Sequence, residues 1–364
     1  WLGITSASAA LGLLAGPPAY ATPQQTPEKQ LIVHGTTPMN AEPALHHLVE
    51  AWETPVKHFY VRSHAPVPKV DLNTFRLKVE GLVENKLSLS IPDMLRRFPQ
   101  TEVTATMTCA GNRRSEHSRV KKVGGVQWAA GPIGNARWGG VRLADVLRLA
   151  GLKNEAKHIW FESIDEVKKS GRTFPFGASI PIAKGLEKTA LGNGTLLATT
   201  MNGAPLPPDH GYPVRTVVPG YVGARSVKWI GRIVVSDRPS ENHYVANAYK
   251  LISNGDAAEW AAAKPIYSFP INSAICSPAA NARIAKGKIT VHGYALPPGH
   301  SEQTIERVEI SADGGKEWHR AKLLAPPREY CWCLWKATIP ILATTKQLTL
   351  RAIDSAGTVQ PETV

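Results

Sequence analysis

Residues 108–115, Thr-Cys-Ala-Gly-Asn-Arg-Arg-Ser, place one thiol close to two guanidinium groups. Soft or redox-active metals prefer a thiolate ligand such as Cys109 would supply. Arg113 and Arg114 can each form two parallel charge-assisted hydrogen bonds to a small oxyanion. The segment therefore suggests redox chemistry on an oxyanion. Taken alone, however, a single cysteine is more often a buried inert residue, and an arginine pair is more often a solvated surface.

A second group of polar residues lies in residues 60–68, Tyr-Val-Arg-Ser-His-Ala-Pro-Val-Pro. Pro66 and Pro68 favour an extended loop, because each disfavours helix at the residue before it. Arg62 and His64 are two positions apart, so in an extended chain their side chains point to the same face. The alternative is an ordinary surface loop.

Cations and turn-forming residues gather further along, in residues 209–229. His210, Arg215 and Lys228 stand among many Gly and Pro residues, whose turns can present backbone N–H groups to an anion. A phosphate attached to a hydrogen-bonding heterocycle would suit these groups. The alternative is a set of polar turns that covers the core.

Two aromatic residues near cations, Trp128 and Tyr249, could wall such a site and exclude water. A single tryptophan is more often part of the hydrophobic core, so this assignment depends on the other clusters.

The charge balance favours anionic partners, since the 364 residues carry a formal net charge of +13. The chain has no basic helix, zinc-finger spacing or ribonucleoprotein motif, so a small anion fits better than nucleic acid. The four cysteines include no CxxC and no CxxCH pair, so covalent haem is excluded. If Cys109 binds a metal, a cofactor must supply further ligands.

Residues 1–21 form a small, apolar run that ends in Ala-Tyr-Ala, which is typical of an export signal. The run is too short and too rich in Gly and Pro for a stable membrane span. We expect an exported, periplasmic protein with a linker over residues 22–40. A flexible extension is the alternative for residues 1–21.

Short helices and strands alternate without a regular order in residues 41–264. The pattern predicts strands over 75–82 and 230–235. It also predicts helices over 90–98, capped by Ser90 with a proline in the first turn, and over 143–152. This mixture indicates an α+β domain rather than a doubly wound sheet.

The pattern changes in residues 265–364, where short strands alternate with turns. Strands are predicted over 288–294, 305–311, 332–339 and 348–353, with turns such as Ala-Asp-Gly-Gly at 312–315. Such spacing is typical of a β-sandwich. The last of these strands lies close to the final residue, and we expect the natural protein to continue.

Five runs in the same order resemble the sulfite oxidase family of molybdenum enzymes, and the resemblance covers about residues 40–364. These runs are residues 109–115 (Cys-Ala-Gly-Asn-Arg-Arg-Ser), 134–141 (Gly-Asn-Ala-Arg-Trp-Gly-Gly-Val), 176–181 (Phe-Gly-Ala-Ser-Ile-Pro), 209–215 (Asp-His-Gly-Tyr-Pro-Val-Arg) and 222–229 (Val-Gly-Ala-Arg-Ser-Val-Lys-Trp). The resemblance implies a molybdopterin-binding catalytic domain over 41–264. It also implies an immunoglobulin-like dimerisation domain over 265–364, and hence a homodimer.

The same resemblance implies a role for each matched residue. Cys109 would be the protein ligand to molybdenum, which the dithiolene of molybdopterin would also bind. The substrate pocket would contain Arg62, Arg114, Trp128 and Tyr249. Molybdopterin would be held by Tyr60, Ser63, His64, Asp165, His210, Arg215, Ser226, Val227 and Lys228. Arg113 would only support the turn.

Two positions depart from the family pattern. Ser63 stands where the family commonly has Asn, which would change its contact with the cofactor. Gly124 stands where animal members have Lys, which removes a positive charge near the pocket and would weaken sulfite binding.

The activity implied is oxidation of sulfite to sulfate, with two electrons passed singly to an external acceptor such as a c-type cytochrome. One alternative is a reductase of nitrate or a sulfoxide that uses the same cofactor. Another is a non-catalytic anion-binding module, because a fold does not determine a function.

Overall fold

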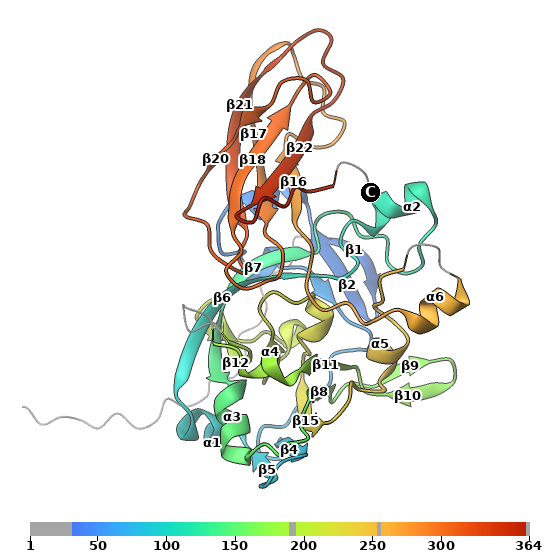
Figure 1. Cartoon of the computed structure of the whole chain (residues 1–364), viewed down its shortest axis with the longest axis vertical. Coiled ribbons are helices and arrows are strands. Elements are labelled where there is room, and N and C mark those ends of the chain that lie inside the picture. The colour runs from blue at the N-terminus through green and yellow to red at the C-terminus, as the bar shows by residue number, and fades with distance from the viewer. Residues whose placement is uncertain (1–30, 189–193, 253–255, 362–364) are drawn as a thin grey trace, which may run out of the picture.

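The computed structural model of the chain describes residues 31–188, 194–252 and 256–361. A mixed α and β domain comes first, and a β-sandwich, orange and red in Figure 1, stands at one end of it. The expected export segment over residues 1–21 lies outside the described residues. Within those ranges no helix is both long enough and apolar enough to cross a bilayer.

The expected linker over residues 22–40 is wrong from Leu31 onward, because a hairpin begins there. Strands β1 (Leu31–Thr36), β2 (Met39–Pro43) and β3 (Val61–Arg62) form a three-stranded sheet in that order. Asn40 and Glu42 in β2 are buried polar residues. Most of their hydrogen bonds go to groups distant in sequence, such as Arg62 for Asn40 and the amides of residues 129 and 131 for Glu42, so local composition did not reveal the strand. The short helices η1 (Leu45–Val49) and η2 (Val56–His58) connect β2 to β3.

One five-stranded sheet leads to the candidate site. Strands β6 (Gln100–Thr108), β7 (Ile133–Arg142), β12 (Leu196–Met201) and β13 (Ala204–Pro205) are neighbours, and β14 (Arg215–Val217) also pairs with β12. Strands β6 and β7 are antiparallel, with Thr108 opposite Ile133. Cys109 therefore follows the last residue of a paired strand, and the turn after it enters helix α2 (Arg114–Val120).

The second five-stranded sheet has the order β11-β8-β15-β4-β5. Its strands are β4 (Leu77–Gly81), β5 (Leu87–Leu89), β8 (His158–Ser163), β11 (Gly177–Pro181) and β15 (Ile230–Ser236). Only β15 and β4 run parallel; the other pairs are antiparallel. A separate hairpin, β9 (Val167–Lys169) and β10 (Arg172–Phe174), follows β8. The strands predicted over 75–82 and 230–235 are confirmed as β4 and β15.

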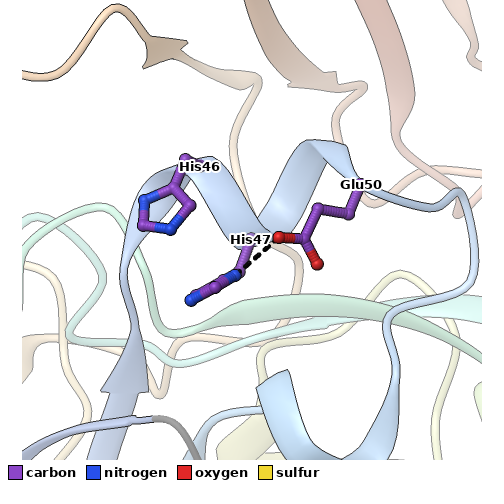
Figure 2. Close-up of side chains that lie close together, drawn as sticks. All are labelled: His46, His47 and Glu50. Atoms are coloured by element: carbon purple, nitrogen blue, oxygen red, sulfur yellow. Dashed lines mark hydrogen bonds and ion pairs between the residues drawn. The ribbon is translucent and has the colours of Figure 1, made fainter.

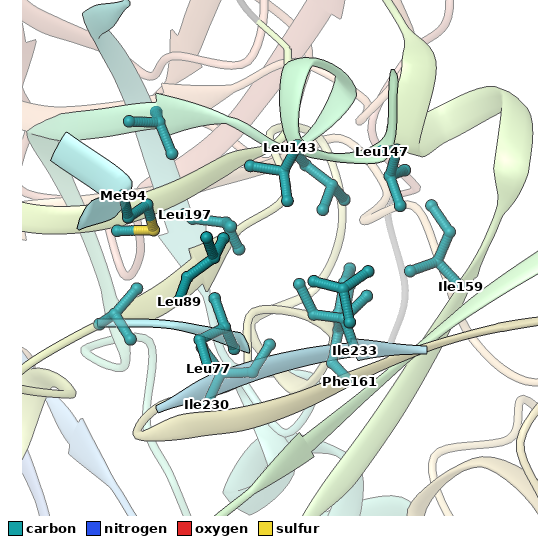
Figure 3. Packing of buried hydrophobic residues seen from close by; sticks show 14 of the residues in the cluster. Leu77, Leu89, Met94, Leu143, Leu147, Ile159, Phe161, Leu197, Ile230 and Ile233 are labelled. Carbon is teal, nitrogen blue, oxygen red and sulfur yellow. The ribbon is translucent and has the colours of Figure 1, made fainter. Parts of the chain in front are cut away.

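Helices α1 (Ile91–Arg97) and α3 (Leu143–Ala150) confirm the two predicted helices. Ser90 caps α1, since its side chain accepts a hydrogen bond from the Asp93 amide at 3.1 Å. Figure 3 shows the core that joins these helices to both sheets, with Met94 and Leu143 of the helices near Leu77 and Leu197 of the strands. Burying this apolar surface is the main favourable contribution to folding.

The second domain confirms the predicted sandwich. One layer has the order β16-β17-β21-β20, and the other has the order β19-β18-β22. The strands are β16 (Asn272–Ser277), β17 (Gly287–Leu296), β18 (Ile305–Ser311), β19 (His319–Arg320), β20 (Lys322–Leu323), β21 (Cys333–Ile341) and β22 (Thr349–Asp354). The remaining short helices are α4 (Ile182–Leu186), η3 (Pro208–His210), η4 (Gly223–Arg225), α5 (His243–Ala246) and α6 (Ala257–Ala262).

The two domains are joined by direct hydrogen bonds. Trp52 and Trp332 each donate an indole N–H to the backbone carbonyl of the other, at 3.2 Å and 3.0 Å. The amide of Thr106 in β6 also donates to the carbonyl of Tyr330 at 2.8 Å. The sandwich therefore holds the strand that leads to Cys109.

Candidate functional site

A cavity of about 660 Å³, part of it open to solvent, lies where loops from both sheets of the first domain meet. Its wall brings together segments that are up to 190 positions apart in the sequence, from Phe59 to Tyr249. Eleven of the fourteen predicted site residues line it: Tyr60, Arg62, Ser63, His64, Cys109, Asp165, His210, Arg215, Ser226, Lys228 and Tyr249.

Cys109 is fixed by the turn that follows β6. Its amide donates to the carbonyl of Pro132 at 2.9 Å, and its carbonyl accepts from Asn112 at 2.9 Å. The Gly111 amide lies 3.4 Å from the sulfur and donates to it. Burial raises the pKa of the Cys109 thiol, while Arg62, the Gly111 amide and Arg114 act in the opposite direction. The sulfur is therefore oriented toward a cavity where nearby cations favour its thiolate form.

The two arginines after Cys109 have different roles. Arg113 has a φ of 63° and donates to the carboxylate of Glu116 at 2.8 Å and to the carbonyl of Ser273 in the sandwich. Arg114 instead donates to the carbonyl of Val126 at 2.9 Å. A Cβ atom on Gly111 would come within 2.5 Å of the Arg114 guanidinium, so only glycine leaves space for it. Arg113 secures the turn, and the charge of Arg114 acts on Cys109.

Arg62, His64 and Tyr249 form a hydrogen-bonded group on the cavity wall. His64 Nε2 lies 2.8 Å from Arg62 Nη2 and 2.9 Å from the hydroxyl of Tyr249. Because a guanidinium only donates, Nε2 accepts and the ring proton lies on Nδ1. Burial, followed by the charges of Arg62 and Lys228, holds the pKa of His64 well below its usual value. Burial also raises the pKa of Tyr249, so at neutral pH His64 is uncharged and the phenol keeps its proton.

Arg62 is also held from its other side. Its Nη1 donates to Asn40 Oδ1 at 2.9 Å and to the carbonyl of Ser63 at 2.6 Å. Strand β2 thus orients the guanidinium of a residue in β3.

Lys228 spans the cavity toward the loop of residues 60–68. Its ammonium donates to Ser63 Oγ at 2.6 Å and to the carbonyl of Asp209 at 2.9 Å. It also lies 4.3 Å from the ring centre of Trp229, at the distance of a cation–π contact. Ser63, the residue that departs from the family pattern, therefore contacts a cation of the cavity directly.

Arg215 is a buried cation at the base of the cavity. It donates to the carbonyls of His210 and Ser226, at 2.9 Å and 3.1 Å, and only 3% of it is exposed. Burial lowers the pKa of Arg215 to about 10, so it remains charged at neutral pH. Tyr60 lies close by, and burial raises its pKa well above the usual value.

Asp165 is one of two aspartates, with Asp209, that line this mainly basic wall. It accepts a hydrogen bond from the amide of Phe176 at 2.7 Å, and burial raises its pKa. A carboxyl group here can accept hydrogen bonds from the N–H groups of a heterocycle.

The guanidinium groups of Arg62, Arg114 and Arg215 share one property. Within the described ranges, none of the three has a carboxylate within 4.0 Å. Buried and half-buried charges normally carry a partner, because removing an ion from water is costly. The arrangement is therefore suited to an anion that enters from outside the chain.

Three predicted residues do not line the cavity. Arg114 is set back behind Gly111, as described above. Trp128 is fully buried, packs edge-on against His34 at 4.9 Å, and its carbonyl accepts from the amide of Ser115. Val227 lies in the core, and its amide donates to Thr216 Oγ1 at 2.7 Å. Trp128 and Val227 thus support the wall rather than form it.

Sequence reasoning missed several residues of the wall. Phe59, Met107, Trp229 and Asp209 line the cavity beside predicted residues. Their closeness in sequence to predicted residues could have identified them. Met107 lies two positions before Cys109, and the others immediately precede or follow a predicted residue. Glu42, which holds the loop behind Cys109, gave no signal at all.

Comparison with known proteins agrees with this geometry. Residues 64–244 match the family model described as the oxidoreductase molybdopterin binding domain. Residues 263–364 match the molybdenum cofactor oxidoreductase dimerisation domain.

Relatives match over nearly the whole chain. A sulfite oxidase from Gallus gallus is 44% identical over 92% of this chain and 73% of its own length. A sulfite oxidase from Arabidopsis thaliana is 40% identical over 96% of this chain and 93% of its own length. The crystal structure of the sulfane dehydrogenase SoxCD from Paracoccus pantotrophus has a TM-score of 0.76 and 28% identity, over 98% of this chain and 87% of that chain. The chain therefore belongs to the sulfite oxidase family of molybdopterin-dependent oxidoreductases.

Proposed function

We propose that this protein oxidises sulfite to sulfate and passes the electrons singly to an external acceptor of the c-type cytochrome class. In the balanced reaction, sulfite and water give sulfate, two protons and two electrons. The observation that carries the proposal is the thiol of Cys109 facing a cavity in which, among the residues that the structure describes, Arg62 and Arg215 form no ion pair with a carboxylate. A soft metal ligand and a site for an oxyanion thus occupy the same space.

The residues of the cavity fit the family's cofactor, molybdenum bound to molybdopterin. Cys109 supplies the thiolate, and Arg215, His210 and Lys228 would hold the phosphate. Asp165 would accept hydrogen bonds from the pterin, while Tyr60, Ser63, His64 and Ser226 would complete its surroundings. The bound cofactor supplies a metal that changes its oxidation state by two electrons and exchanges oxygen. The protein's own contribution is binding, orientation and electrostatics.

The cations of the cavity would attract and orient the substrate. Arg62 presents a guanidinium that Asn40 and the Ser63 carbonyl hold in place. Arg114 adds positive charge from behind the Gly111 turn. Preorganised charges cost no reorganisation when negative charge on the substrate moves during the reaction.

Tyr249 and His64 would control the proton beside the substrate. The neutral His64 accepts from both Arg62 and Tyr249, so it fixes both donors without adding a charge. The phenol of Tyr249 keeps its proton because burial raises its pKa, and it can turn this proton toward a substrate oxygen. The two protons released from water in the reaction would then leave through the solvent-open side of the cavity.

We further propose that the protein forms a homodimer through residues 263–364 and acts in the periplasm. The match to a dimerisation domain supports the first point. The apolar run over residues 1–21 is the sole support for the second. Light scattering of the purified protein and fractionation of cells that express the full gene would test them. A monomer, or a protein confined to the cytoplasm, would contradict the respective proposal.

The decisive experiment combines cofactor analysis with an assay. Protein from a host that makes molybdopterin should contain molybdenum and pterin in equal amounts and should reduce cytochrome c or ferricyanide when sulfite is added. Nitrate and methionine sulfoxide, offered with a reduced dye, should be turned over more slowly. Faster turnover of either would indicate that the protein is a reductase of that substrate. Protein that contains no molybdenum and no pterin would indicate an anion-binding module.

A further inference from the structure

A cluster of imidazole and carboxylate groups lies outside the cavity, on helix η1 and beside η2. Figure 2 shows His46, His47 and Glu50 pointing into the same space from one short stretch of chain. A metal-ligating atom of each lies within 4.8 Å of those of the other two. The helix places positions 46, 47 and 50 on neighbouring faces, so one stretch supplies all three groups.

The carboxylate of Glu50 is already oriented by two imidazoles. Its Oε1 lies 2.7 Å from His47 Nδ1, and its Oε2 lies 3.3 Å from His58 Nδ1. Carboxylates that bind a metal are usually fixed by a further hydrogen-bonding group, and the buried His58 is placed to do this for Glu50.

The stacking and the exposure of the imidazole rings distinguish the roles of the three histidines near Glu50. His47 and His58 are stacked, with ring centres 3.9 Å apart and an angle of 22° between planes. The ring nitrogens of stacked rings lie in nearly parallel planes, so an ion in the plane of one ring lies well outside the plane of the other. His58 is only 1% exposed, whereas His46 is exposed and His47 is half-buried. His46 and His47 are therefore the accessible ligands, and His58 positions Glu50.

We propose that His46, His47 and Glu50 form a binding site for a divalent cation of the zinc class, with water as the fourth ligand. Two imidazoles and one carboxylate are a common donor set for Zn²⁺. Ligands of tetrahedral Zn²⁺ lie about 2.0–2.1 Å from the metal and hence about 3.3 Å from one another. His47 Nδ1 and Glu50 Oε1, now 2.7 Å apart, must therefore separate slightly, and the His46 donor must adjust its position. The exposed side chain of His46 can rotate to do this, and the metal replaces the proton between His47 and Glu50.

The location of the cluster determines what the ion would do. Helix η1 packs against β16 and β17 of the sandwich. Its Leu48 is buried together with Phe269, Tyr294 and Trp332 at the junction of the two domains. A metal that fastens η1 would therefore stabilise this junction, because a ligand that binds only the folded state raises its stability. The site does not depend on the proposed sulfite chemistry.

The test uses the cofactor-loaded protein without a polyhistidine tag, titrated with Zn²⁺ by calorimetry. We expect binding of one equivalent and a melting temperature that rises with the Zn²⁺ concentration. His46→Ala and Glu50→Gln should each weaken this binding at least about tenfold, as loss of a ligand does. Both residues are exposed, so their substitution leaves the core intact. Co²⁺ in place of Zn²⁺ should give the absorption bands of a four-coordinate ion.

His319→Ala is the matched control, because His319 also faces a glutamate, at 3.9 Å from Glu317, but lies outside the cluster. This variant should bind Zn²⁺ as the unmodified protein does. Absence of saturable binding would overturn the proposal. Equal affinity in the His46→Ala, Glu50→Gln and unmodified proteins would overturn it as well, since the ion would then bind elsewhere.

Discussion

Glu42 Oε1 lies 2.7 Å from His34 Nε2, and the buried carboxylate of this pair stands directly behind the loop that supports Cys109. The same carboxylate accepts from the amides of Ala129 and Gly131, at 2.9 Å and 3.0 Å. That loop in turn accepts the hydrogen bond from the Cys109 amide at Pro132. The hairpin of β1 and β2 thus determines where the thiol lies.

Replacing Glu42 with Gln should destabilise the protein by about 1–3 kcal/mol, because an amide is a weaker acceptor than a carboxylate and brings an N–H group that cannot pair here. Urea unfolding measures this loss. Glu102→Gln is the control, since Glu102 is half exposed on the surface beside Arg137 and its change should cost less than about 1 kcal/mol. An equal loss of unfolding free energy in the two variants would show that Glu42 does not support the loop behind Cys109.

Replacing Cys109 with Ser should lower sulfite turnover by more than about 100-fold, because even the loss of a residue that supports a metal ligand costs 10–100-fold. Oxygen is a harder ligand than sulfur, so the potential of the metal should also shift. Steady-state assays and a redox titration measure the two effects. Cys276→Ser tests a buried thiol outside the cavity and should keep normal turnover. Unaltered activity of the Cys109 variant would exclude this residue as the ligand.

Replacing Arg62 with Gln should raise the KM for sulfite by roughly 10-fold to 150-fold, as expected for loss of a charged hydrogen bond worth about 1.5–3 kcal/mol. Arg114→Gln should raise KM less, because this charge lies behind Gly111. Arg113→Gln is the neighbouring control. Its side chain bonds Glu116 and the sandwich, so its substitution should lower stability and leave KM unchanged. A larger KM effect for Arg113 than for Arg62 would contradict this assignment.

The half-buried His64 should make stability depend on pH. Its pKa in the folded protein is well below that of the unfolded chain, near 6.5. Below pH 6.5 the unfolded state binds more protons than the folded state, so the free energy of unfolding falls as the pH drops. One such group contributes a slope of up to about 1.4 kcal/mol per pH unit.

Cofactor-free protein, unfolded with urea between pH 7 and pH 5, gives the direct measurement. His64→Gln should flatten the slope, while the shifted His58, His158 and His243 keep part of it. A slope that is the same in the variant and the original protein would show that His64 is not the group responsible.

Sequence alone determined the elements whose pattern is local. The cap at Ser90, the alternation in β4 and β15, and the turns between the sandwich strands follow from neighbouring residues, and the structure confirms them. The family motifs also identified most of the cavity wall, because loops that hold a ligand keep recognisable runs of residues. Their roles toward the cofactor stay predictions.

Tertiary structure decided what depends on distant residues. Nothing near Glu42 in the sequence indicates that it supports residues 129–131, and nothing near Arg114 places it behind Gly111 rather than on the wall. Val227 and Trp128 stand within or near motifs, but packing turns them to the core. A motif determines which groups are available, whereas burial and hydrogen bonds formed across long separations determine which of them reach the cavity.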